Sequence, residues 1–523
     1  MTRVLFSIAF LVLLNFSLHA QTRYWVFFSD KKGSTLSIEE FHSLSLERRI
    51  NVGLSGFDST DFPVSRHYLE QIYGMVRRMG YSSRWLNAVA VEGSKRQMKK
   101  IAKLPFVSSV EPSQGYFHQT KSFEQNIPNN SEADLLRRQL VRFNGDKFTL
   151  KGIDGKGIRI AVFDTGFPGV DTHDAFEHLR RDNRIVATYD FTRNSLYVYR
   201  SNSHGTKVLS CIAGINNDKP MGFATGADFL LAITEVSREP FSEEENWLAA
   251  LEWADRNGAQ IVNSSLGYTF HRYFPEQMDG KSTFISKVAS MAASKGILVV
   301  NAAGNEGSSR WSVIGSPADA DSIISVGGIS PDDHLHISFA SHGPTVDGRL
   351  KPNVSAYGVA VVVSPKGGYE FASGTSFASP LVAGFAACAW QLNPKASAAE
   401  MLSLIEKSGD LYPYFDYAHG YGVPQANFFT DTVKNNGASK RLNFKKTEKG
   451  VVVVINDFNS KLEAGYNTTH LFWHIRQPNG MLSEYGVVRV YQSEAFFVPN
   501  NKIYSEGHTL WVNYLGETTS FPL

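Results

Sequence analysis

Residues 373–384 read Ser-Gly-Thr-Ser-Phe-Ala-Ser-Pro-Leu-Val-Ala-Gly, and they lead into an apolar run, Leu381 to Trp390, with helical spacing and many alanines. Small residues followed by such a run predict that Ser376 lies where a loop turns into a buried helix. Unpaired N–H groups of the first turn and the positive end of the helix dipole could stabilise an anion formed there. A serine that only caps the helix has the same local pattern, so the rest of the chain must decide.

Length and composition describe a large, exported globular protein. The 523 residues suffice for two or three domains, and 42% of them are hydrophobic. The formal net charge is only +2, with Lys and Arg spread out, so nothing indicates a nucleic-acid partner or a membrane surface. Residues 1–20 have the pattern of a signal peptide, with Arg3, an apolar core from Val4 to Leu14 and a small residue at Ala20.

The apolar core of that leader is too short to span a bilayer. The expected location is therefore secreted, periplasmic or at the cell surface, with an N-terminal membrane anchor as the alternative.

Only two cysteines are present, Cys211 and Cys388, so the chain has no disulfide framework. Both lie in predicted apolar helices and are expected to be buried free thiols, although one disulfide between them stays open.

The pattern of elements predicts a signal peptide and three domains: residues 1–20, 21–120, 121–435 and 436–523. Residues 21–120 mix short strands and helices, and a polar stretch at 113–133 resembles an exposed linker suited to cleavage. Residues 436–523 contain only short strands separated by Gly, Asn and Pro turns, which indicates a β-sandwich.

Within the predicted domain 121–435, residues from about 139 to 428 alternate apolar strands with helices. The expected strands are 159–163, 229–233, 260–262, 297–300 and 323–326, and the expected helices between them include 243–256 and 284–294. Continuous apolar strands joined by helices predict a parallel sheet covered on both faces. In such sheets the active groups gather beyond the carboxyl ends of the strands.

The first of these strands ends in Phe163-Asp164-Thr165-Gly166, which places a carboxylate at a strand tip. A simple turn would explain Asp164 alone. Asp-Thr-Gly is also how an aspartic protease presents its catalytic carboxylate, but that mechanism needs two such aspartates sharing one proton. No second Asp-Thr-Gly or Asp-Ser-Gly occurs in the sequence, which argues against that class.

Two further motifs carry groups suited to catalysis. His204 precedes Gly205 at the start of another apolar helix, and histidine is the natural proton carrier near neutral pH. Asn305 lies between Gly304 and Glu306-Gly307, again after a strand, and its amide can donate to an oxygen that becomes negative. Each motif alone has a structural explanation, as a cap or a turn.

Taken together, these motifs resemble the subtilisin-like serine proteases (subtilases), in the order Asp, His, Asn, Ser and over roughly residues 152–426. The resemblance implies a three-layer α/β/α sandwich with a mainly parallel seven-stranded sheet. It implies Ser376 as the nucleophile, His204 as the base and acid, and Asp164 as the group that orients His204. Asn305 and the backbone N–H of Ser376 would form the oxyanion hole.

The same resemblance implies the substrate-binding residues. Ser265, Leu266 and Gly267 resemble the segment that pairs with the substrate backbone as an added strand. Ala302, Ala303 and Gly304 would complete the walls of the pocket for the residue before the scissile bond. Gly315 aligns with the floor of that pocket, and a glycine floor predicts a preference for large apolar residues.

The N-terminal domain resembles the inhibitory pro-domain of this family, most clearly at residues 85–91 and 105–112. This implies an intramolecular inhibitor that the enzyme itself removes, with a permanent N-terminal domain as the alternative.

Phe377 departs from the methionine that often follows the nucleophile. The loop at 215–222 lies where some relatives bind calcium but carries Lys219 and Pro220, so no metal or cofactor is assigned, and a structural calcium ion stays open.

The leading hypothesis is therefore an exported, monomeric serine endopeptidase made as a zymogen and acting on proteins or peptides. The competing hypothesis is a catalytically silent secreted binding protein on a protease scaffold, with the C-terminal sandwich as its working part. Intact Asp164, His204, Asn305 and Ser376 favour the enzyme, since a scaffold needs none of them.

Overall fold

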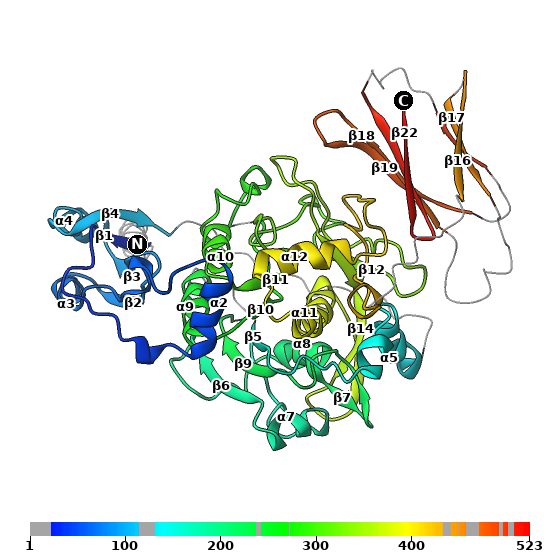
Figure 1. The fold of residues 1–523 in the computed structure, drawn as a ribbon. Helices are drawn as coiled ribbons and strands as arrows, with labels where there is room; N and C mark the ends of the chain where they lie inside the picture. Colours follow the sequence, from blue (N-terminus) through cyan, green and yellow to red (C-terminus); the bar gives the residue numbers. More distant parts are fainter. Residues whose placement is uncertain are drawn as a thin grey trace, which may run out of the picture. The chain divides into compact units, whose positions relative to one another are not determined.

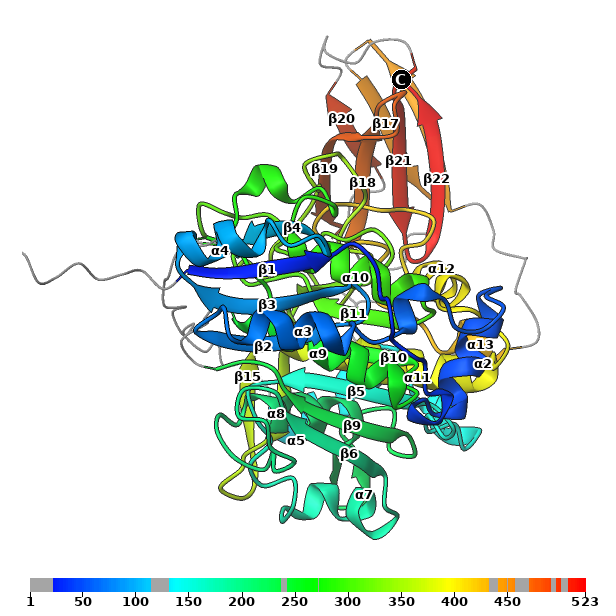
Figure 2. The same cartoon turned by 90° about the vertical axis from the view of Figure 1, so that its left-hand side faces the viewer.

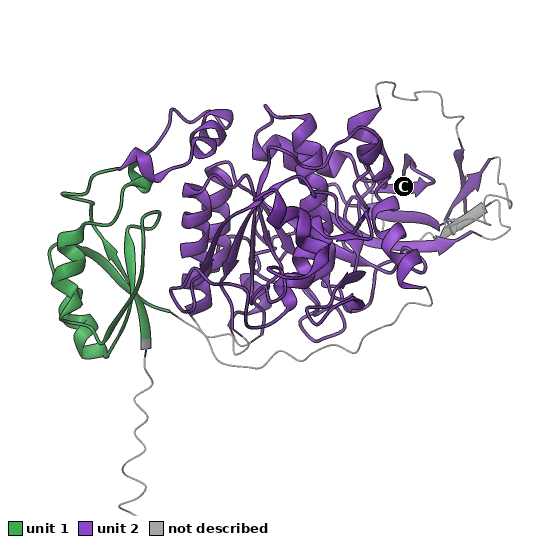
Figure 3. Ribbon diagram, turned by 90° about the horizontal axis from the view of Figure 1, so that it is seen from below, with its two compact units in different colours: residues 1–36, 58–114 green, residues 37–57, 115–523 purple. Residues whose placement is uncertain are grey.

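The computed structural model describes residues 22–113, 131–236, 242–270, 272–431, 441–448, 450–456, 470–490, 495–499 and 507–523. The predicted signal peptide and most of the predicted linker lie outside these ranges. The chain forms two compact units, residues 1–36 with 58–114 and residues 37–57 with 115–523 (Figure 3). The domain boundaries inferred from the sequence stay predictions.

The larger unit is built on the predicted parallel sheet of seven strands (Figures 1 and 2). In spatial order the strands are β13 (Val354–Tyr357), β12 (Ile324–Ile329), β11 (Leu298–Ala302), β10 (Ile261–Ser264), β5 (Arg159–Asp164), β9 (Asp228–Ile233) and β6 (Ile185–Asp190). Every residue of β5, β10 and β11 is buried, which explains the apolar runs of β5 and β11.

Helices cover both faces of this sheet, as a three-layer sandwich requires (Figure 1). On one face α8 (His204–Ala213) and α11 (Thr375–Leu392) share a core with Ile160 and Val162 of β5. The next residue of β5 points the other way, and Phe163 packs its ring 6.3 Å from that of Trp247 in α9 (Ser242–Arg256). The helix α10 (Phe284–Ser294) packs beside α9.

Shorter elements complete the larger unit. They are α2 (Ser43–Asn51), α5 (Glu132–Val141), α6 (Asp146–Leu150), α7 (Glu177–Arg181), α12 (Ala398–Lys407), α13 (Asn427–Thr430) and the hairpins β7–β8 (Ile215–Asn216, Lys219–Pro220) and β14–β15 (Val359–Val363, Tyr369–Ser373).

The smaller unit is an antiparallel sheet with two helices on it. Its strands are β2 (Arg78–Ser83), β3 (Ala88–Gly93), β1 (Thr22–Phe28) and β4 (Val107–Pro112), in that spatial order, and its helices are α3 (Arg66–Tyr73) and α4 (Lys95–Ile101). The sequence has helical spacing from His67 to Arg78, but α3 ends at Tyr73, because Gly74 forms its C-cap and β2 begins at Arg78.

The predicted β-sandwich is present at the C-terminus (Figure 2). One sheet has β16 (Leu442–Thr447), β17 (Gly450–Ile455) and β20 (Ala495–Pro499), and the other has β19 (Leu482–Arg489), β18 (His470–Arg476), β21 (Thr509–Tyr514) and β22 (Glu517–Pro522). Residues of both sheets, including Val453 and Val512, form one buried core.

Residues 412–421, which include four tyrosines, bond to this sandwich from the α/β part of the chain. The hydroxyl of Tyr414 donates to the carbonyl oxygen of Trp473 at 3.0 Å, and the hydroxyl of Tyr417 accepts from the N–H of Leu482 at 3.2 Å. These two hydrogen bonds join the segment to β18 and to the start of β19.

Both cysteines are buried free thiols, as predicted. Burial raises the pKa of Cys211 to about 12, so this thiol stays protonated at neutral pH. Within the described residues, no helix is both long and apolar enough to cross a membrane.

Phe385, in the middle of α11, is the most informative position for a stability test. Its ring lies 5.2 to 5.9 Å from those of Phe143, Phe148, Phe223 and Phe429, and the side chain is fully buried. We expect Phe385→Ala to lower the free energy of unfolding by about 3–5 kcal/mol, since it leaves a cavity in a rigid core. Denaturant unfolding in a Ser376→Ala background measures this.

The matched control is Phe428→Ala, because Phe428 is 39% exposed. It should cost less than about 1 kcal/mol. Equal losses for the two variants would contradict the packing described for α11.

Candidate active site

Three strands bring the candidate residues to one edge of the sheet. Ser264 of β10 lies opposite Phe163 of β5 and Asn301 of β11 in register. Because parallel strands end at the same edge, Asp164, Ser265 and the segment 302–305 emerge side by side. The helices α8 and α11 begin at this edge with His204 and Thr375, so their N-terminal N–H groups point toward it.

Asp164 and His204 form a hydrogen-bonded pair. The Nδ1 of His204 lies 2.9 Å from both carboxylate oxygens of Asp164, whose side chain is only 1% exposed. The backbone N–H of Thr165 donates to the same carboxylate at 2.7 Å. Gly205 permits this approach, because a Cβ there would lie 2.9 Å from Asp164 Cβ and 2.5 Å from the oxygen of Gly166.

This pairing governs the protonation of His204. Desolvation lowers the pKa of the imidazole, but the charge of Asp164 and the hydrogen bond to it together outweigh desolvation and raise the pKa above its ordinary value of 6.5. With Nδ1–H donated to Asp164, the neutral ring keeps Nε2 as its acceptor. The pair can therefore take up a proton at Nε2 and stabilise the resulting imidazolium.

Ser376 lies in the first turn of α11, as predicted, and exchanges two hydrogen bonds with Ser265. Pro380 has no N–H, so it cannot make the helical bond to the carbonyl of Ser376. The hydroxyl of Ser265 donates to that carbonyl at 3.0 Å instead, and the hydroxyl of Ser376 donates to the carbonyl of Ser265 at 3.2 Å. His204 is near the same turn, with its ring 5.6 Å from that of Phe377.

Asn305 is oriented by Thr375. Its amide oxygen accepts from the backbone N–H of Thr375 at 2.8 Å and from the Thr375 hydroxyl at 3.0 Å. The amide nitrogen is therefore left to donate elsewhere, and it lies 3.4 Å from where a Cβ on Gly374 would be. An oriented amide donor beside the first turn of α11 suits the stabilisation of an oxyanion.

The predicted substrate-binding segments are held together by one side-chain and one backbone hydrogen bond. Asn301 donates through Nδ2 to the carbonyl of Leu266 at 2.9 Å, and Gly315 donates its N–H to Ala303 at 3.2 Å. Gly315 lies close to Thr269, whose methyl carbon is 2.9 Å from the place of a Cβ on Gly315. The specificity expected from Gly315 stays a prediction.

The loop considered for calcium is a short hairpin. Ile215 pairs with Pro220 and Asn216 with Lys219, and the turn residues Asn217 and Asp218 have positive φ of 47° and 61°. Over the described ranges, no cluster of three or more His, Cys, Asp or Glu side chains is suited to hold a metal. The structure therefore adds no ligand set for a cation at this hairpin.

Two family models match the chain. The "Subtilase family" model matches residues 155–423, which contain all the candidate residues, and a "Peptidase S8 propeptide domain, Bacteroidota" model matches residues 23–130. The chain belongs to the subtilase family. It is a serine endopeptidase, and it carries a propeptide domain as a zymogen of this family does.

Individual subtilases resemble the chain at about 30% identity. Subtilisin DY of Bacillus licheniformis is 30% identical over 275 residues, 51% of this chain and 91% of its own. Subtilisin E of Bacillus subtilis is 29% identical over 333 residues, 62% of this chain and 76% of its own. Serine protease AprX of Bacillus subtilis is 29% identical over 304 residues, 52% of this chain and 64% of its own.

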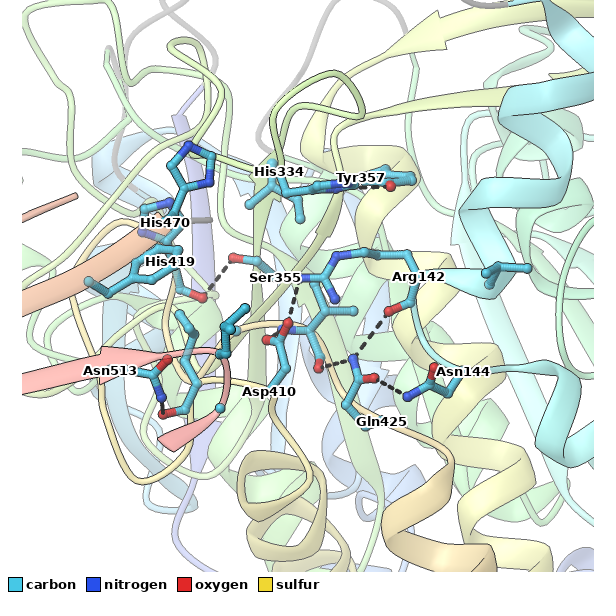
Figure 4. A pocket seen from close by; sticks show the side chains of 18 of the residues that line it. Arg142, Asn144, His334, Ser355, Tyr357, Asp410, His419, Gln425, His470 and Asn513 are labelled. Carbon is cyan, nitrogen blue, oxygen red and sulfur yellow. Dashed lines mark hydrogen bonds and ion pairs between the residues drawn. The ribbon is translucent and has the colours of Figure 1, made fainter. Parts of the chain in front are cut away.

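A cavity of about 490 Å³ lies apart from these residues, beside α5 and the C-terminal sandwich (Figure 4). Its polar groups bond to one another. Arg142 pairs with Asp410 at 2.5 Å, and Gln425 accepts from Asn144 at 2.7 Å. The cavity contains none of the predicted site residues, and its internal pairing indicates an interface between structural parts.

The sequence did not indicate which residues hold the candidate site residues in place through hydrogen bonds. Thr375 stands inside the motif that drew attention to Ser376, but its bonds to Asn305 span 70 positions along the chain. Asn263 accepts from the hydroxyl of Ser379 at 2.9 Å and donates to that of Ser265 at 3.3 Å. The signal for the Ser265 bond was Pro380, whose missing N–H leaves one helical carbonyl to be satisfied from outside.

Phe377 should make the enzyme resistant to mild peroxide. Methionine can be oxidised to the sulfoxide but phenylalanine cannot, so the residue following Ser376 offers no oxidisable sulfur beside His204. Activity should therefore persist at doses that oxidise exposed methionines such as Met481, which is 37% exposed. Peptide mapping of Met481 reports the dose, and rapid inactivation at that dose would contradict the expectation.

Proposed function

We propose that this subtilase is exported and hydrolyses peptide bonds with Ser376 as nucleophile, His204 as base and acid, Asp164 as the orienting carboxylate and Asn305 in the oxyanion hole. The observation that carries the proposal is the Asp164–His204 hydrogen bond at the sheet edge where α11 begins with Thr375 and Ser376. A buried carboxylate that holds an imidazole in this way is the orienting half of a catalytic triad.

In the first step Ser376 Oγ attacks the carbonyl carbon of the substrate. The Oγ–H proton moves to Nε2 of His204 as the Oγ–C bond forms, and the carbonyl oxygen becomes negative. This step needs a rotation of the Ser376 hydroxyl from Ser265 toward His204. The amide of Asn305 and the N–H of Ser376 receive the oxyanion.

In the second step the C–N bond of the tetrahedral intermediate breaks. His204 gives its proton to the leaving amine, and the acyl group stays on Ser376 as an ester. Water then repeats the sequence: His204 takes its proton, the hydroxide adds to the ester carbon, and Ser376 Oγ leaves with the proton from His204. Asp164 keeps Nδ1 protonated throughout, so Nε2 faces the reaction.

The substrate would bind as an added strand along Ser265, Leu266 and Gly267, with its residue before the scissile bond between that segment and Ala302–Gly304. Export rests on the leader pattern of residues 1–20 and would deliver the enzyme to the cell exterior or periplasm. We further expect a monomer that uses no metal or other cofactor in catalysis.

A covalent probe separates the enzyme from a silent scaffold. A serine-directed phosphonate should label the mature protein, because it reacts only with an activated hydroxyl. Ser376→Ala should abolish both the labelling and the release of the propeptide. Ser294→Ala, which changes an exposed serine at the end of α10, serves as the matched control and should keep the labelling. Pepstatin should have no effect. Labelling of Ser376→Ala at the wild-type rate would overturn the assignment of the nucleophile.

The pH dependence of kcat/KM tests the role of Asp164. His204 must be neutral to act as base, and its pKa is raised above 6.5, so activity should be lost as the pH falls through a midpoint above 6.5. In Asp164→Asn the carboxylate charge that raises the pKa is gone and desolvation remains. The midpoint should therefore move to lower pH while kcat falls about 10⁴-fold.

Asp182→Asn is the control for this measurement, since Asp182 lies at the surface beside Arg181. It should leave the midpoint and kcat unchanged. An Asp164→Asn profile with the wild-type midpoint would show that Asp164 does not set the pKa of the base.

A further inference from the structure

Residues 37–57, called the strap below, are propeptide by sequence but pack with the catalytic part of the chain. The propeptide model spans residues 23–130, and the strap interrupts it. Its flanking residues Leu36 and Asp58 belong to the smaller unit, whereas the strap belongs to the larger one (Figure 3). The helix α2 within it lies beside α9 and α10 (Figure 1).

The face of α2 that meets the catalytic domain is polar. Its buried residues are Ser45, Arg48 and Arg49, at 0%, 3% and 0% exposure. A helix that belongs permanently to a core normally buries an apolar stripe. The fully buried residues of α2 are all polar, which suits a segment that must remain soluble once it is released.

Both arginines converge on Asp255. Arg49 donates through Nη1 and Nη2 to the two carboxylate oxygens at 2.9 and 2.7 Å. Arg48 donates to the same carboxylate, and its Nε donates to the carbonyl of Lys295 at 3.0 Å. The carboxylate of Asp255 is completely buried, so it depends on these cations for compensation.

The receiving surface consists of acceptors at two helix ends. Asp255 is in the last turn of α9, and Lys295 follows the last residue of α10. Carbonyls at a helix C-terminus lack intrahelical partners and carry partial negative charge. The Nε of Arg48 donates to one of these, the oxygen of Lys295 at the end of α10, and its Nη1 donates to the oxygen of Ala259, three residues beyond α9. This surface is built to receive arginine.

Backbone contacts fix the strap on this surface. The N–H of His42 donates to the oxygen of Arg256 at 2.7 Å. A Cβ on Gly296 would lie 2.8 Å from Cγ of Arg48, so the glycine lets the arginine stem pass. The rings of Phe41 and Phe57, from the two ends of the strap, lie 4.4 Å apart and flank the guanidinium of Arg49 at 5.5 and 5.1 Å. The strap is thus a closed loop.

The contact lies at the end of the sheet opposite to the active site. Ala259 immediately precedes Gln260 and β10, and Lys295 precedes β11 by three residues, whereas Ser265 and Ala303 follow the carboxyl ends of these strands. Strands of four and five residues separate the two ends by about 13–17 Å. The strap therefore does not occupy the place of the scissile bond.

We propose that the strap is a tether which keeps the cleaved propeptide on the catalytic domain through Arg48, Arg49 and Asp255, and that its departure uncovers an arginine-binding exosite. This inference rests on the proposed function only in taking the propeptide to be cut from the catalytic domain. Cleavage after residue 113 does not break the strap contact, so release of the propeptide requires a second event.

The experiment uses the full chain with Ser376→Ala and an engineered endoprotease site within residues 114–130. After the cut, amide hydrogen exchange is followed in the helix α2. An isolated nine-residue helix is marginal in water, so slow exchange of these amides reports docking. We expect α2 to stay protected after the cut and the N-terminal fragment to co-elute with the catalytic domain.

Asp255→Asn tests the contact itself, because it removes the charge that both arginines share. The fragment should then dissociate about 100-fold faster or more, measured by the rate at which it leaves the complex. Arg66→Met is the matched control, since Arg66 is 92% exposed and pairs with Glu70 outside the strap. This control should leave the dissociation rate unchanged.

Two results would overturn the tether. One is exchange of the α2 amides at the rate of an unfolded peptide after the cut, while amides of the sheet strands stay protected. The other is wild-type dissociation from Asp255→Asn. If Asp255→Asn does not fold, the exchange measurement on the parent chain still decides. Because the chain carries Ser376→Ala, failure of the triad would leave this result unaffected.

Discussion

The constraint on which the structure depends is that β5, β10 and β11 are parallel and end at one edge. Asp164 terminates β5, Ser265 follows β10, and Asn305 lies just beyond β11. No single segment could supply these groups, because strand register alone brings together residues separated by more than 100 positions. The starts of α8 and α11 meet the same edge, so His204 and Ser376 arrive on rigid helices whose orphan N–H groups favour negative charge.

The site residues are positioned by side chains that are unfavourable in the interior or at the start of an apolar helix. Pro380 is unfavourable inside a helix, yet it frees the Ser376 carbonyl for the hydroxyl of Ser265 and so couples α11 to the end of β10. Thr375 donates both its backbone N–H and its hydroxyl to the amide oxygen of Asn305, which fixes the direction of the amide. Buried polar side chains at the start of an apolar helix are costly unless they are paired, and here the pairing builds the site.

The sequence predicted what depends on local pattern. Fully buried strands such as β5, and the helix α10, show as unbroken apolar runs or clean helical spacing, and their bounds were nearly right. The edge strand β6 is mostly only partly buried, and β13 has only four residues, so neither stood out in the sequence. The docking of α2 was invisible for another reason: Arg49 meets Asp255 across 206 positions, and no local pattern records such a partner.

The two ends of the sheet thus carry separate features: the residues proposed for catalysis lie at the carboxyl ends of the strands, and the strap lies at the amino ends. The central claim concerns the first end, and a crystal structure of the phosphonate adduct tests it most directly. The account predicts phosphorus bonded to Ser376 Oγ, with the phosphoryl oxygen about 3 Å from both Asn305 Nδ2 and the Ser376 N–H, and His204 Nε2 within hydrogen-bond reach. An adduct on another residue, or a phosphoryl oxygen pointing away from Asn305, would contradict it.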